Sequence, residues 1–484
     1  MDVDEPRRDD RVQDGVSSSM GHMTKESKSK EDHMQGENGE PVHSSILEEL
    51  GWRGLIKQQT HQQELDEALA GETPVTLYCG FDPTADSLHA GSLLPIVALA
   101  HFRRHGHDPI ALVGGATGLI GDPSGKSTER ELSDEATVQT NIDGISVQLR
   151  AILDRVLTMH TELLDARVIE DEARQQIPIV NNADWMKPWS FIGFLRDIGK
   201  HFRVNAMMAR DSVKDRLENR DQGISYTEFS YMLIQAYDFL HLSRDMGCTL
   251  QVGGSDQWGN ITAGTDLIRR TDSTPAFGLT LPLLTDAQGR KYGKSEGNAI
   301  WLDKERTSPY DFYQYWYNLD DEEIPRLLRC FTFLPEQEIE ELSAQIERKD
   351  RPQEVKSRFA HEVTWLVHGK EEADKAVRVS RMLFGEEISG LTDRELSDLF
   401  KDAPSIEIAS SRLNEGVPIA DLLVEADLEK SKGAARRLLK QNGVYINNKR
   451  FGQEERDVTS ADLSSETMLV LRAGKKKQCV VKVV

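Results

Sequence analysis

A turn near residue 80 holds side chains that are suited to binding phosphate. The sequence there runs Tyr78-Cys-Gly-Phe-Asp82-Pro-Thr84, and His89, Gly91 and Ser92 follow it. A β-rich run before the turn and an apolar helix after it place Thr84 and His89 beside free backbone N–H groups, where phosphate oxygens are favoured. Gly91 lets a nucleotide come close to the backbone. The alternative interpretation is a helix-opening histidine followed by a packing glycine.

Two further loops carry pairs of cations. The segment Gly121–Ser127 is close to a phosphate-binding P-loop, but that pattern requires glycine where the chain has Ile120. Lys126 and Arg130 can still act as mobile cations over a polyphosphate. Lys291 and Lys294 lie on either side of a glycine and can stabilise charge that develops in phosphoryl or nucleotidyl transfer. Both pairs are also compatible with solvated loop charges.

A helix further along the chain carries polar groups where burial is expected. Ser225-Tyr-Thr-Glu228 is a capping-box pattern that predicts a helix to about His241. Tyr231, Gln235 and Asp238 share one face of this helix, which is apolar elsewhere. A buried carboxylate and amide need partners, so we expect either a polar ligand pocket or an internal hydrogen-bond network.

A glycine-rich segment offers a second carboxylate. It runs Gly253-Gly254-Ser-Asp256-Gln257, and its two glycines would let the backbone approach a ribose whose hydroxyl donates to Asp256. A simple Gly–Asp turn explains the same residues.

The elements around these segments predict a parallel sheet. A strand at 75–79, a turn, a helix from about His89 to His105 and a strand at 109–113 form a βαβ unit. The Gly-rich segment 114–122 then lies at the carboxyl ends of the strands, where open sheets bind ligands. From about 318 to 400 the chain is charged and helical.

Length and composition limit the class of protein. The 484 residues suffice for two to four domains, and 38% hydrophobic residues suffice for a large core. The longest apolar run, near Leu93–Ala100, is far shorter than the roughly 20 residues of a membrane helix, so no membrane partner is expected. Four cysteines without zinc-ligand spacing predict a reducing compartment, and the histidines form no cluster that predicts a bound metal.

Charge is distributed unevenly along the chain. The net charge is −22, yet residues 430–484 contain 13 basic and 5 acidic residues. A basic end on an acidic body suggests an RNA backbone as partner, the alternative being a solvated basic surface. Residues 1–43 contain 11 acidic and 6 basic residues and almost no large apolar ones, which predicts disorder. Met20 and Met23 leave a later start open.

Together and in this order, these segments resemble a class I aminoacyl-tRNA synthetase of the bacterial-type tyrosyl-tRNA synthetase family. The resemblance runs from Ser44 to Val484 and includes the distinctive runs Phe194–Phe202, Thr227–Tyr231 and Gln257–Gly264. It implies a homodimer and an α/β fold with a Rossmann-like parallel sheet. The implied parts are a catalytic domain (44–280), a signature lysine loop with an α-helical domain (281–400), a linker (401–415) and a small α+β RNA-binding domain (416–484).

The resemblance also implies roles for individual residues. His89-Ala-Gly91-Ser92 matches the family's HIGH signature, with serine in place of the usual final His or Asn, which we expect to alter ATP affinity without abolishing activity. Lys291–Ser295 matches the KMSKS signature, with Tyr and Gly in place of Met and Ser. Tyr78 and Asp238 would hold the phenol of tyrosine. Phenylalanine would leave both groups unpaired, and tyrosine activation is itself a standard example of this kind of rejection.

The remaining roles follow from the same resemblance. The substrate ammonium is assigned to Asp122, Tyr231 and Gln235, and its carboxylate to the neighbourhood of Gln257. The residues assigned to ATP are Asp82, His89, Gly91, Ser92, Gly254, Asp256 and Lys294. The tyrosine carboxylate would attack the α-phosphorus of ATP, and tyrosine would then pass to the 3′-terminal ribose of tRNA(Tyr). Charge that develops in the first step would be stabilised by Thr84, His89, Lys126, Arg130, Lys291 and Lys294. Mg²⁺ accompanies ATP as part of the substrate complex.

Three other interpretations compete with this one. A tryptophanyl-tRNA synthetase shares the fold class but has no use for the pair Tyr78 and Asp238. A small-molecule nucleotidyltransferase also uses an H-x-G-x segment, but it does not account for the length and the basic tail. A non-catalytic RNA-binding or splicing protein on a synthetase body would not need intact lysines and pocket residues. The acidic body and the lack of a recognisable presequence favour a bacterial-type cytoplasm.

Overall fold

The computed structural model describes residues 45–124, 133–165, 168, 176–210, 213–214, 223–285, 294–295, 298–401, 403–452, 456–474 and 477–484. For residues 294, 295 and 298 only the backbone is described. The extension predicted at 1–43 and the predicted cations Lys126, Arg130 and Lys291 lie outside these residues.

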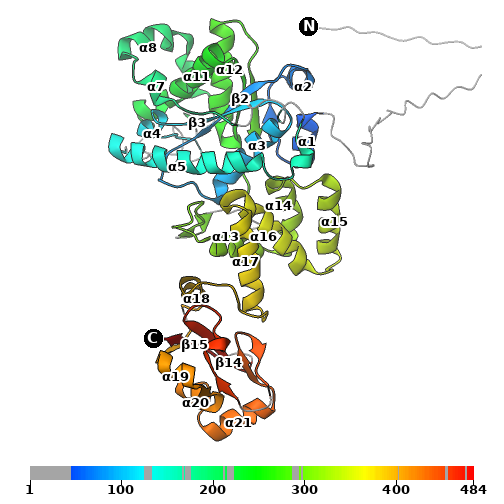
Figure 1. The fold of residues 1–484 in the computed structure, drawn as a ribbon. Helices are drawn as coiled ribbons and strands as arrows, with labels where there is room; N and C mark the ends of the chain where they lie inside the picture. Colours follow the sequence, from blue (N-terminus) through cyan, green and yellow to red (C-terminus); the bar gives the residue numbers. More distant parts are fainter. Residues whose placement is uncertain are drawn as a thin grey trace, which may run out of the picture. The chain divides into compact units, whose positions relative to one another are not determined.

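Between residues 58 and 281 the chain forms a sheet of six strands, counted over the described residues (Figure 1). The strand order is β1-β6-β5-β2-β3-β4; β1 runs antiparallel to β6, and the other neighbours are parallel. This confirms the predicted parallel α/β fold, although the predicted strand 75–79 extends to Phe81. The strands are β1 (Gln58–Gln59), β2 (Thr76–Phe81), β3 (Asp108–Val113), β4 (Ile179–Asn181), β5 (Cys248–Gly254) and β6 (Phe277–Leu281).

Alternate residues of the central strands pack into different cores. Leu77 and Cys79 of β2 belong to the core cluster of α3 (Leu93–Arg104) and α5 (Glu135–Val156). Tyr78, between them, belongs to the cluster of α11 (Tyr226–Met246) and α12 (Trp258–Thr271). Successive side chains of a strand point to opposite faces, so helices cover the sheet on both sides.

Local signals set the ends of the helices that matter for the site. Ser225 Oγ accepts a hydrogen bond of 3.2 Å from Glu228 N at the start of α11, which is the N-cap half of the predicted capping box. This helix continues past the predicted His241 to Met246, where Gly247 adopts a φ of 65°. The helix predicted from His89 begins as a 3₁₀ turn, Ala90–Ser92, and continues as α3. The shorter helices here are α1 (Ile46–Trp52), α2 (Gln62–Ala70), α4 (Thr117–Ile120), α7 (Ala183–Met186), α8 (Phe191–Asp197) and α9 (Val204–Met208).

Residues 309–399 are mostly helical, which confirms the helical character predicted from about 318 to 400. Trp316 and Phe359 are fully buried here and belong to the same core cluster as Leu77 of the sheet. The elements are β7 (Lys294–Ser295), β8 (Asn298–Ala299), α13 (Pro309–Tyr317), α14 (Ile324–Phe331), α15 (Glu336–Glu347), α16 (Pro352–His368), α17 (Lys370–Leu383) and α18 (Asp393–Leu399).

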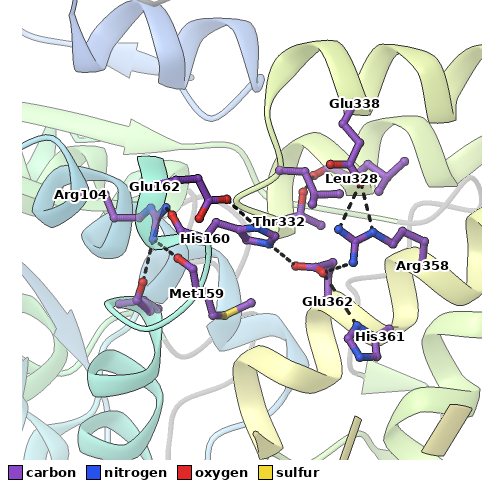
Figure 2. Close-up of polar contacts among 12 residues, drawn as sticks. Arg104, Met159, His160, Glu162, Leu328, Thr332, Glu338, Arg358, His361 and Glu362 are labelled. Carbon is purple, nitrogen blue, oxygen red and sulfur yellow. Dashed lines mark hydrogen bonds and ion pairs between the residues drawn. The ribbon is translucent and has the colours of Figure 1, made fainter. Parts of the chain in front are cut away.

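The residues that follow α5 are bonded to α16 by a buried ionic network (Figure 2). His160 Nε2 lies 2.9 Å from Glu362 Oε2, and Arg358 Nη1 donates to Glu362 Oε1 at 2.6 Å. Burial would raise the pKa of Glu362, but hydrogen bonds with His160 and His361, together with the Arg358 charge, lower it to about 2. Arg104 donates to the carbonyls of Met159 and His160 from the other side. The C-terminal end of α5 is therefore firmly held.

The C-terminal segment has a core of its own. Five of its strands, counted over the described residues, form a sheet in the order β12-β11-β14-β15-β9, and this core includes Leu422, Leu439 and Leu469. The elements are β9 (Ser405–Ile408), α19 (Ser410–Glu415), β10 (Val417–Pro418), α20 (Ile419–Glu425), α21 (Lys432–Lys440), β11 (Val444–Ile446), β12 (Lys449–Arg450), β13 (Asp457–Val458), β14 (Met468–Ala473) and β15 (Lys477–Val483).

None of the helices in the described part of the chain has the length and apolar character needed to cross a membrane.

Candidate active site

The strand order places a ligand crevice between β2 and β5. From β2 the chain crosses to β3 and β4 on one side and later returns to β5 on the other side of β2. The order therefore reverses between the carboxyl ends of β2 and β5, at Phe81 and Gly254. Ligands of open α/β sheets bind outside such a reversal.

One pocket at this point collects four of the residues predicted to bind ATP. It has a volume of about 240 Å³, and its lining includes His89, Gly91, Gly254 and Asp256. Leu94, Pro95, Leu281, Leu283 and Phe331 contribute apolar walls. An apolar pocket with a few polar groups is the usual form of a small-molecule site.

The orientation of the His89 ring is set by its own turn. Nδ1 accepts a hydrogen bond of 3.0 Å from Gly91 N, and His89 O accepts one of 2.7 Å from Ser92 N. Because a ring nitrogen that accepts a hydrogen bond carries no proton, the neutral ring has its proton on Nε2. Nε2 can therefore donate to a phosphate oxygen.

The two carboxylates predicted to bind ATP, Asp82 and Asp256, lie close to glycines. A Cβ at Gly114 would lie 2.3 Å from Thr117 Oγ1 and 3.3 Å from Asp82 Oδ1, so a side chain there would displace the Thr117 hydroxyl and crowd Asp82. A Cβ at Gly254 would lie 2.5 Å from Asp256 Oδ1. Thr84 is exposed on the turn that follows Asp82.

On the face of the sheet that α11 and α12 cover, Tyr78 and Asp238 are both 1% exposed. Asp238 accepts hydrogen bonds from Asn182 Nδ2 at 2.9 Å and from Trp185 Nε1 at 2.8 Å. Burial raises the pKa of Asp238 to about 7, although these two bonds lower it. Burial and then the nearby Asp238 charge raise the pKa of Tyr78 well above its usual value. Among the described residues, Tyr78 Oη is buried without a hydrogen-bond partner.

Three further predicted residues form a chain of hydrogen bonds. Gln235 Nε2 donates to Gln257 Oε1 at 3.2 Å, and Gln257 Nε2 donates to Asp122 Oδ2 at 2.5 Å. Tyr231 is buried one turn before Gln235 on the same helix. The structure thus brings together side chains from the Gly-rich loop, α11 and the turn after β5, as the sequence predicts.

The predicted cations are the part of the site that the structure describes least. Lys126, Arg130 and Lys291 lie outside the described residues, and of Lys294 only the backbone in β7 is described. The segment that follows them is nevertheless placed. Ile300 O accepts from Ala90 N at 2.8 Å, and Leu302 N donates to Leu88 O at 2.9 Å, so Trp301 forms an isolated antiparallel β-bridge with His89.

Sequence reasoning missed the residues that support Asp238 and Gln257. Asn182 and Trp185 follow β4, and Asn260 Nδ2 donates to Gln257 Oε1 at 3.2 Å. The sequence does contain one signal for Asn182, because Asn181 and Asn182 are two adjacent amides directly after a short apolar run. No group of His, Cys, Asp and Glu that could hold a metal is found in the described residues.

Comparison with known families places the chain in a class of enzymes. A family profile described as "tRNA synthetases class I (W and Y)" matches residues 70–385. The sheet and the crevice between β2 and β5 thus belong to a class I aminoacyl-tRNA synthetase. A second profile, described as "Tyrosine--tRNA ligase SYY-like C-terminal domain", matches residues 395–481.

Individual relatives narrow the assignment. The tyrosine–tRNA ligase of Opitutus terrae is 47% identical over 441 residues, which are 91% of this chain and 100% of that protein. Tyrosine–tRNA ligase 1 of Bacillus subtilis is 47% identical over 90% of this chain and 99% of its own length. A C-terminally truncated mitochondrial tyrosyl-tRNA synthetase of Aspergillus nidulans matches with a TM-score of 0.63 and 33% identity, covering 71% of this chain and 95% of that one. The chain belongs to the tyrosine–tRNA ligase family.

Proposed function

We propose that this protein activates L-tyrosine with ATP and transfers it to the 3′-terminal ribose of tRNA(Tyr). The observation that carries the amino-acid assignment is the buried pair Tyr78 and Asp238. A phenol donates to the Asp238 carboxylate and accepts from Tyr78 Oη, which has no other hydrogen-bond partner among the described residues. A tryptophan indole has no oxygen to accept from that hydroxyl.

The polar chain supports the binding of the rest of the amino acid. Asp122, Tyr231 and Gln235 take the ammonium group, and Gln257 lies near the carboxylate. Asp122 and Gln257 are hydrogen-bonded to each other, so the ammonium and carboxylate subsites are adjacent, as they are in an amino acid.

The nucleotide occupies the pocket on the other side of the crevice. His89, Gly91, Ser92, Gly254 and Asp256 surround ATP there, with Asp82 at the adenylate side, and Mg²⁺ enters as part of the ATP complex. The tyrosine carboxylate attacks the α-phosphorus and pyrophosphate leaves. A carboxylate is already a nucleophile, so catalysis consists of positioning and charge stabilisation. Thr84 and His89 serve from the β2 turn, and Lys126, Arg130, Lys291 and Lys294 from the two loops.

The basic C-terminal segment is the proposed contact for tRNA. Arg436, Arg437 and Lys440 are exposed on α21, and the segment from 430 carries 13 basic and 5 acidic residues. Such a surface binds a phosphate backbone through charge, with a strong dependence on salt.

A homodimer is the proposed assembly. Phe191 and Ile192 of α8 are 65% and 71% exposed, and Val204 and Met208 of α9 are exposed as well. Neighbouring exposed apolar side chains of this size mark an interface, and the family resemblance supports a second copy as the occupant. Ile192→Glu should give monomers in sedimentation equilibrium. The matched control Val147→Glu, at an equally exposed position on α5, should leave the dimer intact. A wild-type monomer would refute the assembly.

We propose the cytoplasm as the compartment, because the ligases that the chain resembles come from bacteria. Fractionation of the source cells followed by immunodetection would test this. Recovery in an organelle fraction would contradict it.

ATP–pyrophosphate exchange without tRNA tests the activation step. Tyrosine, phenylalanine and tryptophan are supplied separately to the purified protein. Exchange with tyrosine alone is expected. Exchange with tryptophan would overturn the assignment of Tyr78 and Asp238, and no exchange with any of the three would favour a non-catalytic RNA-binding protein. Charging of tRNA(Tyr) with labelled tyrosine then tests the second step.

A further inference from the structure

One face of α5 holds the turn that leads from β2 to His89. Asn141 Nδ2 donates to Pro83 O at 2.9 Å. Gln148 Oε1 accepts from Leu88 N at 2.9 Å and lies 3.3 Å from Ser87 Oγ. Asn141 and Gln148 are seven positions apart, so they lie on the same face of the helix.

Between these two contacts the helix touches the backbone of the turn. A Cβ at Gly144 would lie 2.1 Å from Asp86 O and 2.9 Å from Asp86 C. Real Cβ atoms do not approach backbone this closely, so only glycine allows the contact. Arg306 forms an ion pair with the Asp86 side chain. The turn is therefore clamped between α5 and the segment after the second lysine loop.

The clamped segment carries the groups proposed to act on the phosphates. Thr84 and His89 lie at its two ends. Leu88 N is held by Gln148, while Leu88 O receives Leu302 N at 2.9 Å. Gln148 thus holds Leu88, which precedes His89 and also accepts the hydrogen bond from Leu302 beside the β-bridge of His89 with Trp301.

Helix α5 is itself held in place, so it can hold this turn in a defined position. Its C-terminal end is held by the network of Figure 2, and Arg155 donates to the carbonyls of Leu366 and Val367 of α16. Its face towards the sheet is buried through Ile145, Leu149 and Ile152. A catalytic group must be held within roughly 0.5 Å of its productive position, and a helix held at its C-terminal end and along its buried face can do this.

We propose that Asn141, Gly144 and Gln148 are positioning residues for tyrosyl-adenylate formation, with Gln148 setting the position of His89. This inference rests on the proposed function. None of the three residues touches the tyrosine subsite, which is built from β2, the Gly-rich loop, α11 and the turn after β5. Their loss should therefore lower the rate of the chemical step and leave tyrosine binding intact.

The main test compares Gln148→Met with Gln148→Glu. Methionine has nearly the same length but no oxygen, so Leu88 N loses its acceptor, whereas glutamate keeps an acceptor oxygen. We expect Gln148→Met to lower kcat of ATP–pyrophosphate exchange by about tenfold to a hundredfold, with KM for tyrosine within twofold of wild type. Gln148→Glu should recover most of the rate.

The matched control is Gln139→Met on the same helix. Gln139 Nε2 donates to Asp143 Oδ1 at 2.9 Å on the exposed side, so this variant loses a hydrogen bond that holds no part of the turn. Its exchange should equal that of wild type. Gly144→Ala is a second probe, because its methyl group displaces Asp86; it should reproduce the loss of kcat.

Equilibrium binding of tyrosine, measured for each variant, establishes that the fold and the amino-acid subsite are intact. The inference is refuted if Gln148→Met and Gly144→Ala exchange like wild type, if kcat and tyrosine affinity fall together, or if Gln148→Glu is no better than Gln148→Met. Absence of exchange in the wild-type protein would instead refute the proposed function, and the positioning role with it.

Discussion

Tyr78→Phe should stabilise the free protein while it weakens recognition of tyrosine. Tyr78 is 1% exposed and packs against Phe239 with ring centroids 5.5 Å apart. Its hydroxyl has no hydrogen-bond partner among the described residues. A buried hydroxyl without a partner costs about 1–3 kcal/mol, so its removal should raise the free energy of unfolding by about 1 kcal/mol.

In the proposed complex, the same substitution removes one hydrogen bond to bound tyrosine. A neutral hydrogen bond contributes about 0.5–1.5 kcal/mol, which corresponds to a fall of about 2- to 12-fold in kcat/KM for tyrosine. Phenylalanine makes no such bond, so its kcat/KM should stay within about twofold. The tyrosine-to-phenylalanine ratio, measured by ATP–pyrophosphate exchange, should fall by the same 2- to 12-fold.

Tyr313→Phe is the matched control for stability. Tyr313 is equally buried, but its hydroxyl is 2.9 Å from Ser357 Oγ. Its removal should lower the free energy of unfolding by about 1 kcal/mol and leave the ratio unchanged. The reasoning fails if Tyr78→Phe loses stability as Tyr313→Phe does, or if the ratio does not change.

Three further predictions concern charge. Burial raises the pKa of Asp238 to about 7; with the phenol on the ionised carboxylate, as proposed, KM for tyrosine should rise about tenfold per pH unit below 7. Asp238→Asn should remove this dependence, and a flat wild-type profile would contradict it. The pKa of Glu362 falls from 4.5 to about 2 on folding, so its contribution of about 3 kcal/mol is present above pH 4.5 and is lost as pH falls towards 2. Urea unfolding at pH 7 should show this loss for Glu362→Gln and under about 1 kcal/mol for Glu338→Gln, which pairs with the same Arg358 at a partly exposed position. Equal losses would refute the role of burial. Arg437→Ala with Lys440→Ala should leave pyrophosphate exchange unchanged, weaken tRNA binding and reduce its salt slope by about one per lost phosphate contact; an unchanged slope would place the tRNA elsewhere.

The sequence predicts those features that depend on neighbours along the chain. The βαβ unit, the N-cap at Ser225 and the shared face of Tyr231, Gln235 and Asp238 follow from local patterns, and the structure has them. The ends of elements are less certain: β2 runs two residues further than predicted, because Gly80 and Phe81 continue the pairing with Leu112 and Val113.

The supports of the site could not be predicted in this way. Asn182 and Asp238 are 56 positions apart, and Leu88 and Gln148 are 60 apart. Which amide reaches which partner depends on how helices pack across the sheet, and no local pattern encodes that packing. The individual roles assigned to the site residues stay predictions until the variants are measured.

Different parts of the fold hold the two sides of the crevice. We therefore expect amino-acid specificity and reaction rate to depend on different residues. The pair proposed to bind the phenol, Tyr78 and Asp238, lies inside a packed core, where burial raises both pKa values and leaves the Tyr78 hydroxyl without a partner among the described residues. The turn proposed to contact the phosphates is held by hydrogen bonds from α5. A substitution in the core should therefore change which amino acid is activated, whereas one on α5 should change how fast it is activated. A variant of Gln148 that altered the tyrosine-to-phenylalanine ratio would show that the two supports are coupled through β2.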